Sequence, residues 1–288
     1  MTDQELYKEA VKLVDTYAED IGDRFPEQLI SLRSCLKKRI EKLSSVKLLA
    51  DLLIAENADL STTKILRPCH RSDPNLNDCI KCAIEDLRPY LARGIPELFI
   101  PSCEPLYIPE IVMNQGNKGS VSVQSIYRNI SVYGPSQFIL KSVNVDMEKE
   151  RIRIKVWLPH LHMTANYSIE GRILMLPISG RGLSEGNYTN IEANVLIQGN
   201  TIQIEGRNHF NVQDVAIDFQ IGHASIYLSD LFEGDLELGE AMNTFLNDNW
   251  RHVAQEFKPI LEETIGDLFK KFANKLYHKY PIEDFLLI

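Results

Sequence analysis

The spacing of apolar residues changes twice along the chain, and each change marks a different predicted structure. Residues 1–60 repeat apolar positions at helical spacing, which predicts two or three short helices. Residues 61–110 hold seven prolines, which leave room for one helix at about 75–92. Asp73 is expected to cap this helix, and Pro74 suits its first position. The apolar run within the first segment is Leu29, Leu32, Leu36, Ile40 and Leu43.

From about residue 110 to residue 230 the apolar period becomes two, which is the pattern of strands with one buried face. Two predicted strands, 151–158 and 161–176, show the alternation best. Short turns rich in Gly and Asn separate the strands, so we expect an antiparallel sheet with one apolar side. The alternating apolar residues are Ile152, Ile154, Val156 and Leu158, then Met163, Ala165, Tyr167 and Ile169, then Ile191, Ala193, Val195 and Ile197, and finally Val215, Ile217, Phe219 and Ile221.

The segment at about 237–280 is the most regular predicted helix, roughly 60 Å long at 1.5 Å per residue. Pro259 lies in its middle and is expected to kink it. A long one-sided helix beside a one-sided sheet favours a sheet that wraps the helix. A solid α+β core would give the same periodicity, so both arrangements stay open. The apolar positions of the helix are Leu238, Met242, Phe245, Leu246, Trp250, Val253, Phe257, Leu261, Ile265, Leu268, Phe269, Phe272 and Leu276.

Composition narrows the classes of protein to consider. The 288 residues are 44% hydrophobic and 25% charged, which is typical of a folded chain. The 31 Lys and Arg residues face 40 Asp and Glu residues, giving a net charge of −9. An acidic chain without a basic cluster flanked by aromatic residues is not expected to bind nucleic acid. No stretch is long and apolar enough to predict a transmembrane helix.

The N-terminus is acidic and no apolar segment follows it, so no secretory signal is predicted. Residues 46–55 come nearest, and they fit either an amphipathic helix or a degraded signal. Three glycosylation sequons and clustered cysteines favour an oxidising compartment. The sequons begin at Asn129, Asn166 and Asn187, and the five cysteines are Cys35, Cys69, Cys79, Cys82 and Cys103.

The sequence predicts no enzyme, no cofactor and no metal site. Cys79 and Cys82 have CxxC spacing, but a second such pair is missing. His160 and His162 fit a solvent-facing pair on one strand better than a metal site. No sequence pattern supports Cys103 as a nucleophile paired with a histidine.

Three stretches together resemble the takeout and juvenile hormone-binding protein family of insects. The first is Ile65-Leu-Arg-Pro-Cys69 with Arg71-Ser-Asp-Pro-Asn-Leu-Asn-Asp-Cys79, continued by Ala83-Ile-Glu-Asp-Leu-Arg-Pro-Tyr-Leu91, Gly94-Ile-Pro96, Ile100-Pro-Ser102 and Glu104-Pro-Leu106. The second runs from Leu158-Pro159 through Tyr167 and Gly171 to Leu174-Met-Leu-Pro-Ile178 and Gly180-Arg-Gly182. The third is Gly239, Met242-Asn-Thr-Phe-Leu-Asn-Asp-Asn-Trp250 and Lys258-Pro259. Order and spacing agree across about 61–288.

The resemblance implies a tubular lipid-binding fold over residues 61–288, preceded by a helical extension of unclear role over residues 1–60. In this α+β fold a strongly curved antiparallel sheet wraps around one long C-terminal helix and encloses an apolar tunnel. A disulfide of the family matches Cys69 and Cys79, which implies that Cys35 is not their partner. Residues 1–60 carry none of the matched motifs and are expected to be dispensable for binding, unless their helices cap a tunnel mouth.

Family membership implies a secreted, non-enzymatic carrier of a small hydrophobic ligand such as a terpenoid hormone, a fatty acid or a similar lipid. The alternative is an extracellular interaction protein whose tunnel is filled by its own side chains. Trp157 is expected to point outward and Trp250 toward the sheet and tunnel. The expected ligand-binding residues are Ile154, Val156, Met163, Tyr167, Val195, Ile217, Met242, Phe245, Leu246, Trp250, Val253, Phe257, Leu261 and Phe269.

Overall fold

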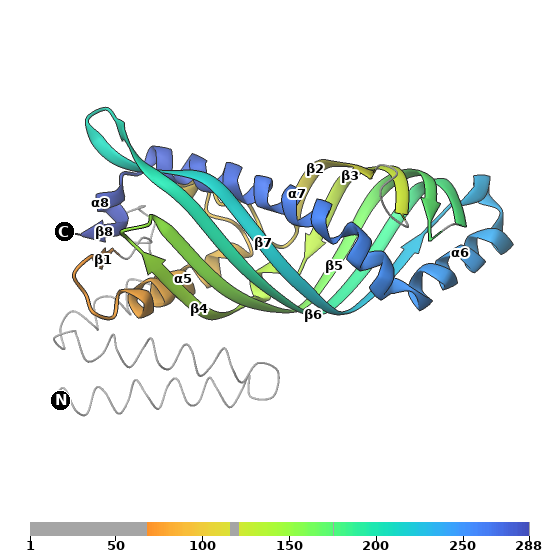
Figure 1. Ribbon diagram of the computed structural model, residues 1–288, viewed down its shortest axis with the longest axis horizontal. Helices are drawn as coiled ribbons and strands as arrows, with labels where there is room; N and C mark the ends of the chain where they lie inside the picture. The colour runs from red at the N-terminus through yellow and green to blue at the C-terminus, as the bar shows by residue number, and fades with distance from the viewer. Residues whose placement is uncertain (1–67, 116–120, 175, 288) are drawn as a thin grey trace, which may run out of the picture. The chain divides into compact units, whose positions relative to one another are not determined.

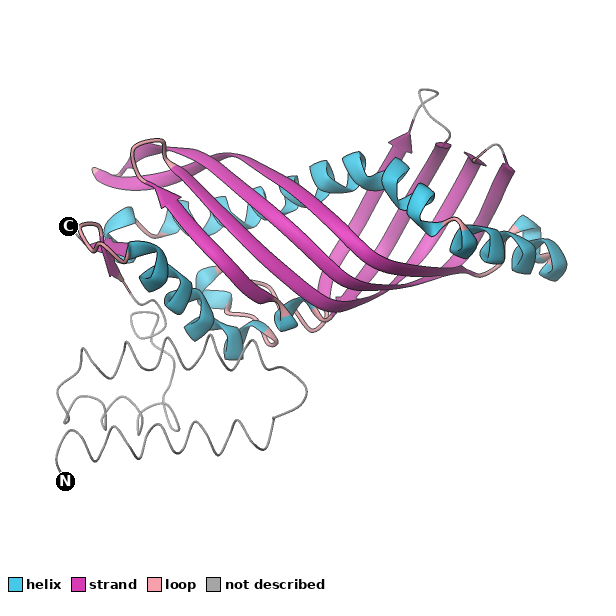
Figure 2. Ribbon diagram, turned by 60° about the horizontal axis from the view of Figure 1, so that its bottom comes forward, coloured by secondary structure: helices cyan, strands magenta, loops and turns pink. Residues whose placement is uncertain are grey.

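The computed structural model describes residues 68–115, 121–174 and 176–287, and its largest element is a strongly curved antiparallel sheet (Figure 1, Figure 2). Helices from the C-terminal part of the chain run along this sheet. A curled half-barrel sheet with a long C-terminal helix confirms the predicted α+β fold class. The strands are β1 Cys69–His70, β2 Leu106–Gln115, β3 Val121–Tyr133, β4 Ile139–Asp146, β5 Arg151–Ile173, β6 Leu176–Ile204, β7 Arg207–Leu228 and β8 Leu286–Leu287.

Five strands of the sheet follow one another in the order β2, β3, β5, β6 and β7, and each pairs antiparallel with its neighbour. β4 pairs with the first residues of β5, and β3 pairs with the remainder, so β3 and β4 lie end to end along β5. The two strands predicted at 151–158 and 161–176 are in fact the single strand β5. Pro159 between them cannot donate to the ladder, but pairing resumes at His160 in the same register.

In the long strands, the alternating buried positions shift by one residue partway along the strand. Toward one end Val156 of β5 pairs with the buried Ala193 of β6, whereas toward the other end Ala165 pairs with the buried Ser184. The ladder skips one position between these pairs, and Asn190 of β6 has a left-handed φ of 53° there. Such an irregularity turns the side chains that follow it toward the opposite face of the sheet. Each strand can therefore bury apolar residues in both of its halves.

Two helices replace the single helix predicted over 237–280. The break lies at Asn249, whose backbone N–H and side-chain amide both donate to the carbonyl of Phe245 and so end the first helix. The second helix continues through Pro259 while packing along β7, and the kink expected at this proline stays a prediction. The helices are α5 Leu76–Leu91, α6 Leu236–Asp248, α7 Trp250–Lys279 and α8 Ile282–Phe285, with short 3-10 turns η1 Pro96–Leu98, η2 Pro135–Gln137 and η3 Phe232–Gly234.

α5 confirms the helix predicted at about 75–92, but its N-terminus differs in detail. Asn75 is the N-cap residue, and the Asp73 carboxylate accepts the N–H of Asn75 at 2.8 Å, ahead of the helix. A disulfide joins Cys69 of β1 to Cys79 of α5, the pairing that the family resemblance implies. Residues 1–60, and with them the expectations for that segment, lie outside the described residues.

The other two described cysteines differ from each other. Cys82 is also held in a disulfide, whereas the thiol of Cys103 is free. Burial, and to a lesser extent the nearby Glu104 carboxylate, raise the pKa of Cys103 above its ordinary value. A raised pKa disfavours the thiolate, the form in which a cysteine acts as a nucleophile.

The free edge of β7 is closed by side chains from α6 and α7. Asn243 donates to the carbonyl of Leu228 and accepts its N–H, both at 2.9 Å. Asn247, one helical turn later, makes the same pair of bonds to Ile226 at 2.7 and 2.9 Å. Asn274 repeats the pattern on Val212 near the other end of β7. These amides stand in for a neighbouring strand, so the edge is protected without one.

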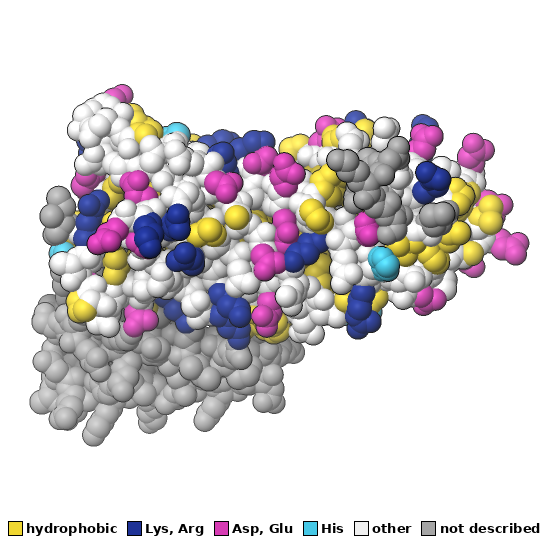
Figure 3. Space-filling model, viewed as in Figure 1, with side chains coloured by type: hydrophobic (Ala, Val, Ile, Leu, Met, Phe, Trp, Pro, Cys, Tyr) yellow, Lys and Arg dark blue, Asp and Glu magenta, His cyan; other side chains and the backbone are white. Residues whose placement is uncertain are grey.

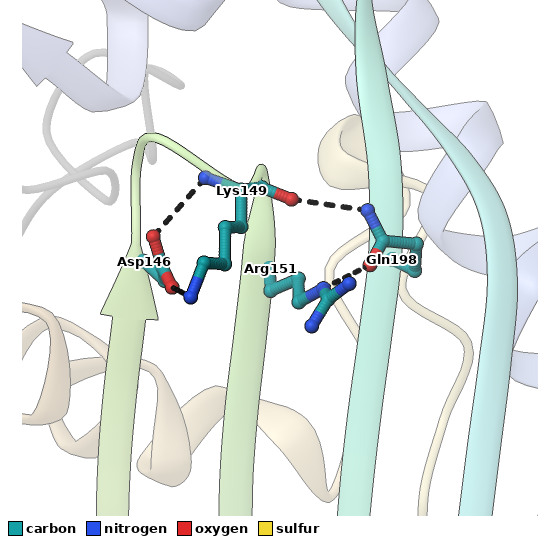
Figure 4. Close-up of polar contacts among 4 residues, drawn as sticks. All are labelled: Asp146, Lys149, Arg151 and Gln198. Carbon is teal, nitrogen blue, oxygen red and sulfur yellow. Dashed lines mark hydrogen bonds and ion pairs between the residues drawn. The ribbon is translucent and has the colours of Figure 1, made fainter.

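The turn between β4 and β5 is fastened to β6 by polar contacts (Figure 4). The Asp146 carboxylate accepts the Lys149 N–H at 3.1 Å and also lies 3.8 Å from its ammonium group. The Gln198 amide donates to the carbonyl of Lys149 at 3.0 Å and accepts from Arg151. One side chain of β6 therefore holds both the turn and the first residue of β5, which helps to fix the register of β5 against β6.

Candidate functional site

Apolar side chains of the sheet, α6 and α7 meet in one buried cluster, which we call the inner cluster. Met242 and Leu246 of α6 and Val253 of α7 reach it from the helices, and each is at most 6% exposed. Phe245 and Phe257 pack against it and remain partly exposed. The sheet and the η3 loop contribute Val123, Tyr167, Ile169, Ile173, Ile178, Leu228 and Leu231, with Tyr127, Leu174, Ile226 and Phe232 packed against them.

Some of the predicted ligand-binding residues belong to the inner cluster or pack against it, and others lie outside it. Outside the cluster, Ile154, Val195 and Ile217 face one another in register across β5, β6 and β7. Val156, Met163 and Leu261 are half-buried. The inner cluster itself unites Tyr167, Met242, Phe245, Leu246, Val253 and Phe257.

Two predicted residues are placed differently. Phe269 is 48% exposed, so α7 does not bury it as the stripe suggested. Trp250 is buried, but its ring contacts the edge of His223 at 5.4 Å and the Arg251 guanidinium at 4.7 Å. It lies at the junction of α6 and α7 and is not a member of the inner cluster. Trp157 is half-buried beneath the Lys141 ammonium group, 5.6 Å from its ring centre.

Glycines on β6 make room for tyrosine rings on the inner side of the sheet. A Cβ on Gly180 would lie 2.8 Å from the Tyr167 hydroxyl, and one on Gly186 would lie 2.6 Å from the Tyr188 hydroxyl. The Tyr167 hydroxyl donates to the carbonyl of Ser229 at 2.6 Å, which ties β5 to the end of β7. Burial raises the pKa of both phenols, so they stay protonated at any physiological pH.

Some hydroxyl-bearing residues that the sequence patterns did not single out lie in β3 and β6. Burial raises the pKa of Tyr127 to about 12, and this side chain, like Tyr188, is half-buried. Ser125, which precedes Tyr127 on the same side of β3, is 1% exposed, and its Oγ lacks a partner. The alternation of Val123, Ser125 and Tyr127 was the available signal for these positions.

An open groove of about 470 Å³ crosses β4 to β7. The predicted ligand-binding residues Ile154, Val195 and Ile217 line it, together with charged side chains such as Arg153, Lys155 and Asp218. Asp218 pairs with Lys258 of α7, which lowers the pKa of the Asp218 carboxyl and raises that of Lys258. Acidic and basic side chains are interspersed over the face seen in Figure 3.

The three sequon asparagines lie on neighbouring strands of the sheet. Asn166 is exposed on β5, and Asn129 accepts a hydrogen bond from the exposed Tyr107. The Asn187 side-chain oxygen lies 3.2 Å from His160 and 3.1 Å from His162. The two imidazoles therefore share one face of β5, as expected, and contact the same amide oxygen.

The described residues bring no three His, Cys, Asp or Glu side chains together as metal ligands. In the same part of the chain, every helix is too short or too polar to cross a membrane.

Comparison with known proteins identifies a family whose sequence profile matches most of the chain. The sequence profile of the family described as "Haemolymph juvenile hormone binding protein (JHBP)" matches residues 48–287. The chain belongs to this family. The resemblance seen in the sequence is thereby confirmed, and the matched region begins before residue 61.

Members of the JHBP family with related sequences come from several insects. "Circadian clock-controlled protein daywake" of Drosophila yakuba is 21% identical over 225 residues, covering 76% of this chain and 86% of that protein. The "Putative beta-carotene-binding protein" of Schistocerca gregaria is 23% identical, covering 72% and 82%. The crystal structure of Takeout 1 from Epiphyas postvittana superposes with a TM-score of 0.64 at 25% identity, covering 77% of this chain and 99% of that chain.

Proposed function

We propose that this JHBP-family protein is a non-enzymatic carrier of a small hydrophobic ligand, held between the curved sheet and helices α6 and α7. The observation that carries the proposal is the inner cluster itself. It gathers apolar side chains from sheet and helices, and some of them, such as Phe245, Phe257 and Tyr127, remain incompletely covered. Family membership supports the same function, and so does the name of the Schistocerca relative, "Putative beta-carotene-binding protein".

Desolvation of the ligand would supply the affinity. Burying about 300 Å² of apolar ligand surface at roughly 25 cal/mol per Å² contributes several kcal/mol before the entropy losses of binding. Within the described sheet and C-terminal helices, His209 is the one acidic or basic side chain that is buried. An interior with so few charged groups suits a terpenoid, a fatty acyl chain or a similar lipid.

The second candidate is an extracellular interaction protein whose interior is filled by its own side chains. The largest side chains of the cluster, Phe245, Phe257 and Tyr167, are compatible with it. Tryptophan fluorescence distinguishes the two candidates. Trp250 is buried at the α6–α7 junction, between the inner-cluster residues Leu246 and Val253 in sequence. Trp157 lies beneath Lys141 and outside this cluster, so a ligand held at the cluster should change the emission of Trp250 only.

The test uses the variants Trp157→Phe and Trp250→Phe, titrated with a panel of fatty acids and terpenoids. The carrier proposal predicts that Trp157→Phe keeps the ligand-dependent change and that Trp250→Phe loses it. If Trp250→Phe keeps the ligand-dependent change and Trp157→Phe loses it, the positions assigned to the two tryptophans relative to the ligand are wrong. An unchanged emission in both variants across the whole panel would favour the filled interior.

We further propose that the protein acts outside the cell and carries glycans at Asn129, Asn166 and Asn187. The family description names haemolymph, and the disulfide between Cys69 and Cys79 agrees with an oxidising compartment. The intact mass of protein secreted from insect cells, before and after enzymatic deglycosylation, checks this. An unchanged mass would contradict the glycan assignment.

A further inference from the structure

Both cysteines of the CxxC pair on α5 are held in disulfides. Cys79 is bonded to Cys69 of β1. Cys82, which is 6% exposed, is disulfide-bonded as well. The two bonds are separate, because the sulfur of a cystine has one sulfur partner and Cys69 and Cys79 already have each other. Helix α5 therefore carries two covalent attachments, and the described fold accounts for one of them.

The partner of Cys82 follows from the cysteines of the chain. The described residues contain Cys69, Cys79, Cys82 and Cys103. The first two are bonded to each other, and the thiol of Cys103 is free. The sequence holds one further cysteine, Cys35. By elimination, the second sulfur of this bond belongs to Cys35.

The division of the chain into compact units points to the same partner. One unit consists of residues 1–67 together with Cys82–Asp86 of α5. The other consists of Pro68–Lys81 and Leu87–Ile288. Cys35 and Cys82 thus belong to one unit, whereas the remaining three cysteines all belong to the other.

We propose that a second disulfide joins Cys35 to Cys82 and attaches the N-terminal segment, residues 1–60, covalently to α5. Its formation removes one proton and one electron from each thiol. The two electrons reduce the disulfide of a thiol oxidant, such as a protein disulfide oxidoreductase, to two thiols that take up both protons. The extracellular location proposed above supplies such an oxidant during secretion. Since the family profile matches residues 48–287, Cys35 lies outside the matched region.

The proposed bond attaches to a helix that is itself fastened to the sheet. Asn77, near the start of α5, accepts the N–H of Val145 of β4 at 2.8 Å. Lys81, next to Cys82, donates to the carbonyl of Lys141 at 3.4 Å. A bond between residues 35 and 82 closes a long loop and restricts the unfolded chain, so its loss should lower the stability of the folded protein.

Tryptic digestion of the full chain without reduction tests the bond directly, after free thiols are blocked with N-ethylmaleimide. Cleavage after Lys and Arg places Cys35 and Cys82 in separate peptides, 34–37 and 82–93. Mass spectrometry should recover these two peptides as one disulfide-linked species, which reduction separates. Peptide 82–93 with a blocked thiol, or linked to a second copy of itself, would overturn the proposal.

The same digest contains its own control. Peptides 65–71 and 72–81 hold Cys69 and Cys79 and should also be recovered linked to each other. If peptide 72–81 is instead linked to 82–93, the two cysteines of the CxxC pair are bonded to each other and the proposal is wrong.

Thiol counts and thermal unfolding of variants give a second measurement. The denatured wild type should show one reactive thiol, that of Cys103, whereas Cys35→Ser and Cys82→Ser should each show two. Both variants should unfold several degrees lower, and the double variant should unfold no lower than either, because the three lack the same bond. Cys103→Ser is the matched control and should show no thiol and an unchanged unfolding temperature. Additive losses in the double variant, or one thiol in Cys82→Ser, would contradict the bond.

Discussion

Single residues determine how closely sheet and loops approach at the inner cluster. Gly180 is one such residue, because Tyr167 and Leu231 leave no room for a side chain there. In the sequence, Gly180 and Gly182 stood out only as part of the second stretch that resembles the family. Their role in making room for a tyrosine hydroxyl and for the loop after β7 depends on contacts distant in sequence, and a local pattern does not contain that information.

Gly180→Ala should therefore destabilise the protein by about 1–3 kcal/mol, since the new methyl group would meet Leu231 backbone at 3.0 Å. Gly239→Ala on α6 is the matched control, because its Cβ would be 3.8 Å from the nearest atom. That change should stabilise the helix by about 0.5–1 kcal/mol. Urea denaturation measures both. Equal effects of the two substitutions would contradict the assigned packing.

The ion pair between Asp218 and Lys258 makes a pH-dependent prediction. Lys258 lowers the pKa of Asp218 below 3.8, first by its hydrogen bond and then by its charge. A lowered pKa in the folded state stabilises the protein above pH 3.8, and this stabilisation is lost as the pH falls through the lowered value. The gain is small, because both side chains are solvent-accessible.

In Lys258→Gln the pKa of Asp218 should return to near 3.8, as followed by NMR titration of its carboxyl carbon. Lys270→Gln, on the same helix, should leave it lowered. If the pKa of Asp218 stays lowered in Lys258→Gln, the Lys258 side chain is not the cause of the lowering.

At the scale of elements, residues of the family motifs form hydrogen bonds that connect helices, strands and turns. The third motif supplies Asn243 and Asn247, which close the edge of β7, and Asn249, which separates α6 from α7. In the first motif, Glu104 accepts the N–H groups of Gly134 and Ser136 and so fixes the turn that separates β3 from β4. This explains why the sequence predicted the fold and left the ligand open: the recognisable residues bind backbone.

Asn243→Ala should destabilise the protein by about 2–4 kcal/mol, because it leaves both the N–H and the carbonyl of Leu228 unpaired in a buried place. Asn144→Ala is the control, since Asn144 is exposed on β4. Its effect should stay within about 0.5 kcal/mol. Equal thermal unfolding temperatures for the two variants would contradict the role of the amides at the edge of β7.

At the scale of the whole molecule, periodicity predicted the antiparallel sheet, the C-terminal helices and most of the apolar face. It joined α6 and α7 into one helix, because the Asn249 break depends on side-chain hydrogen bonds and interrupts no apolar spacing. It also missed Ser125, Tyr127 and Tyr188, because an alternation such as that of Val123, Ser125 and Tyr127 marks one face of a strand and does not say whether that face is buried. Their position became visible only when β3, β5 and β6 were in register.

The central claim is that the interior binds one hydrophobic molecule, and native mass spectrometry of the full chain tests it most directly. Protein purified from an insect cell culture and measured without denaturation should show a mass excess of one lipid per chain. Organic extraction should remove this excess, and incubation with a neutral lipid should restore it at the same stoichiometry. A chain that shows its bare mass throughout, before extraction and after incubation with lipid, would contradict the carrier account and favour an interior filled by side chains.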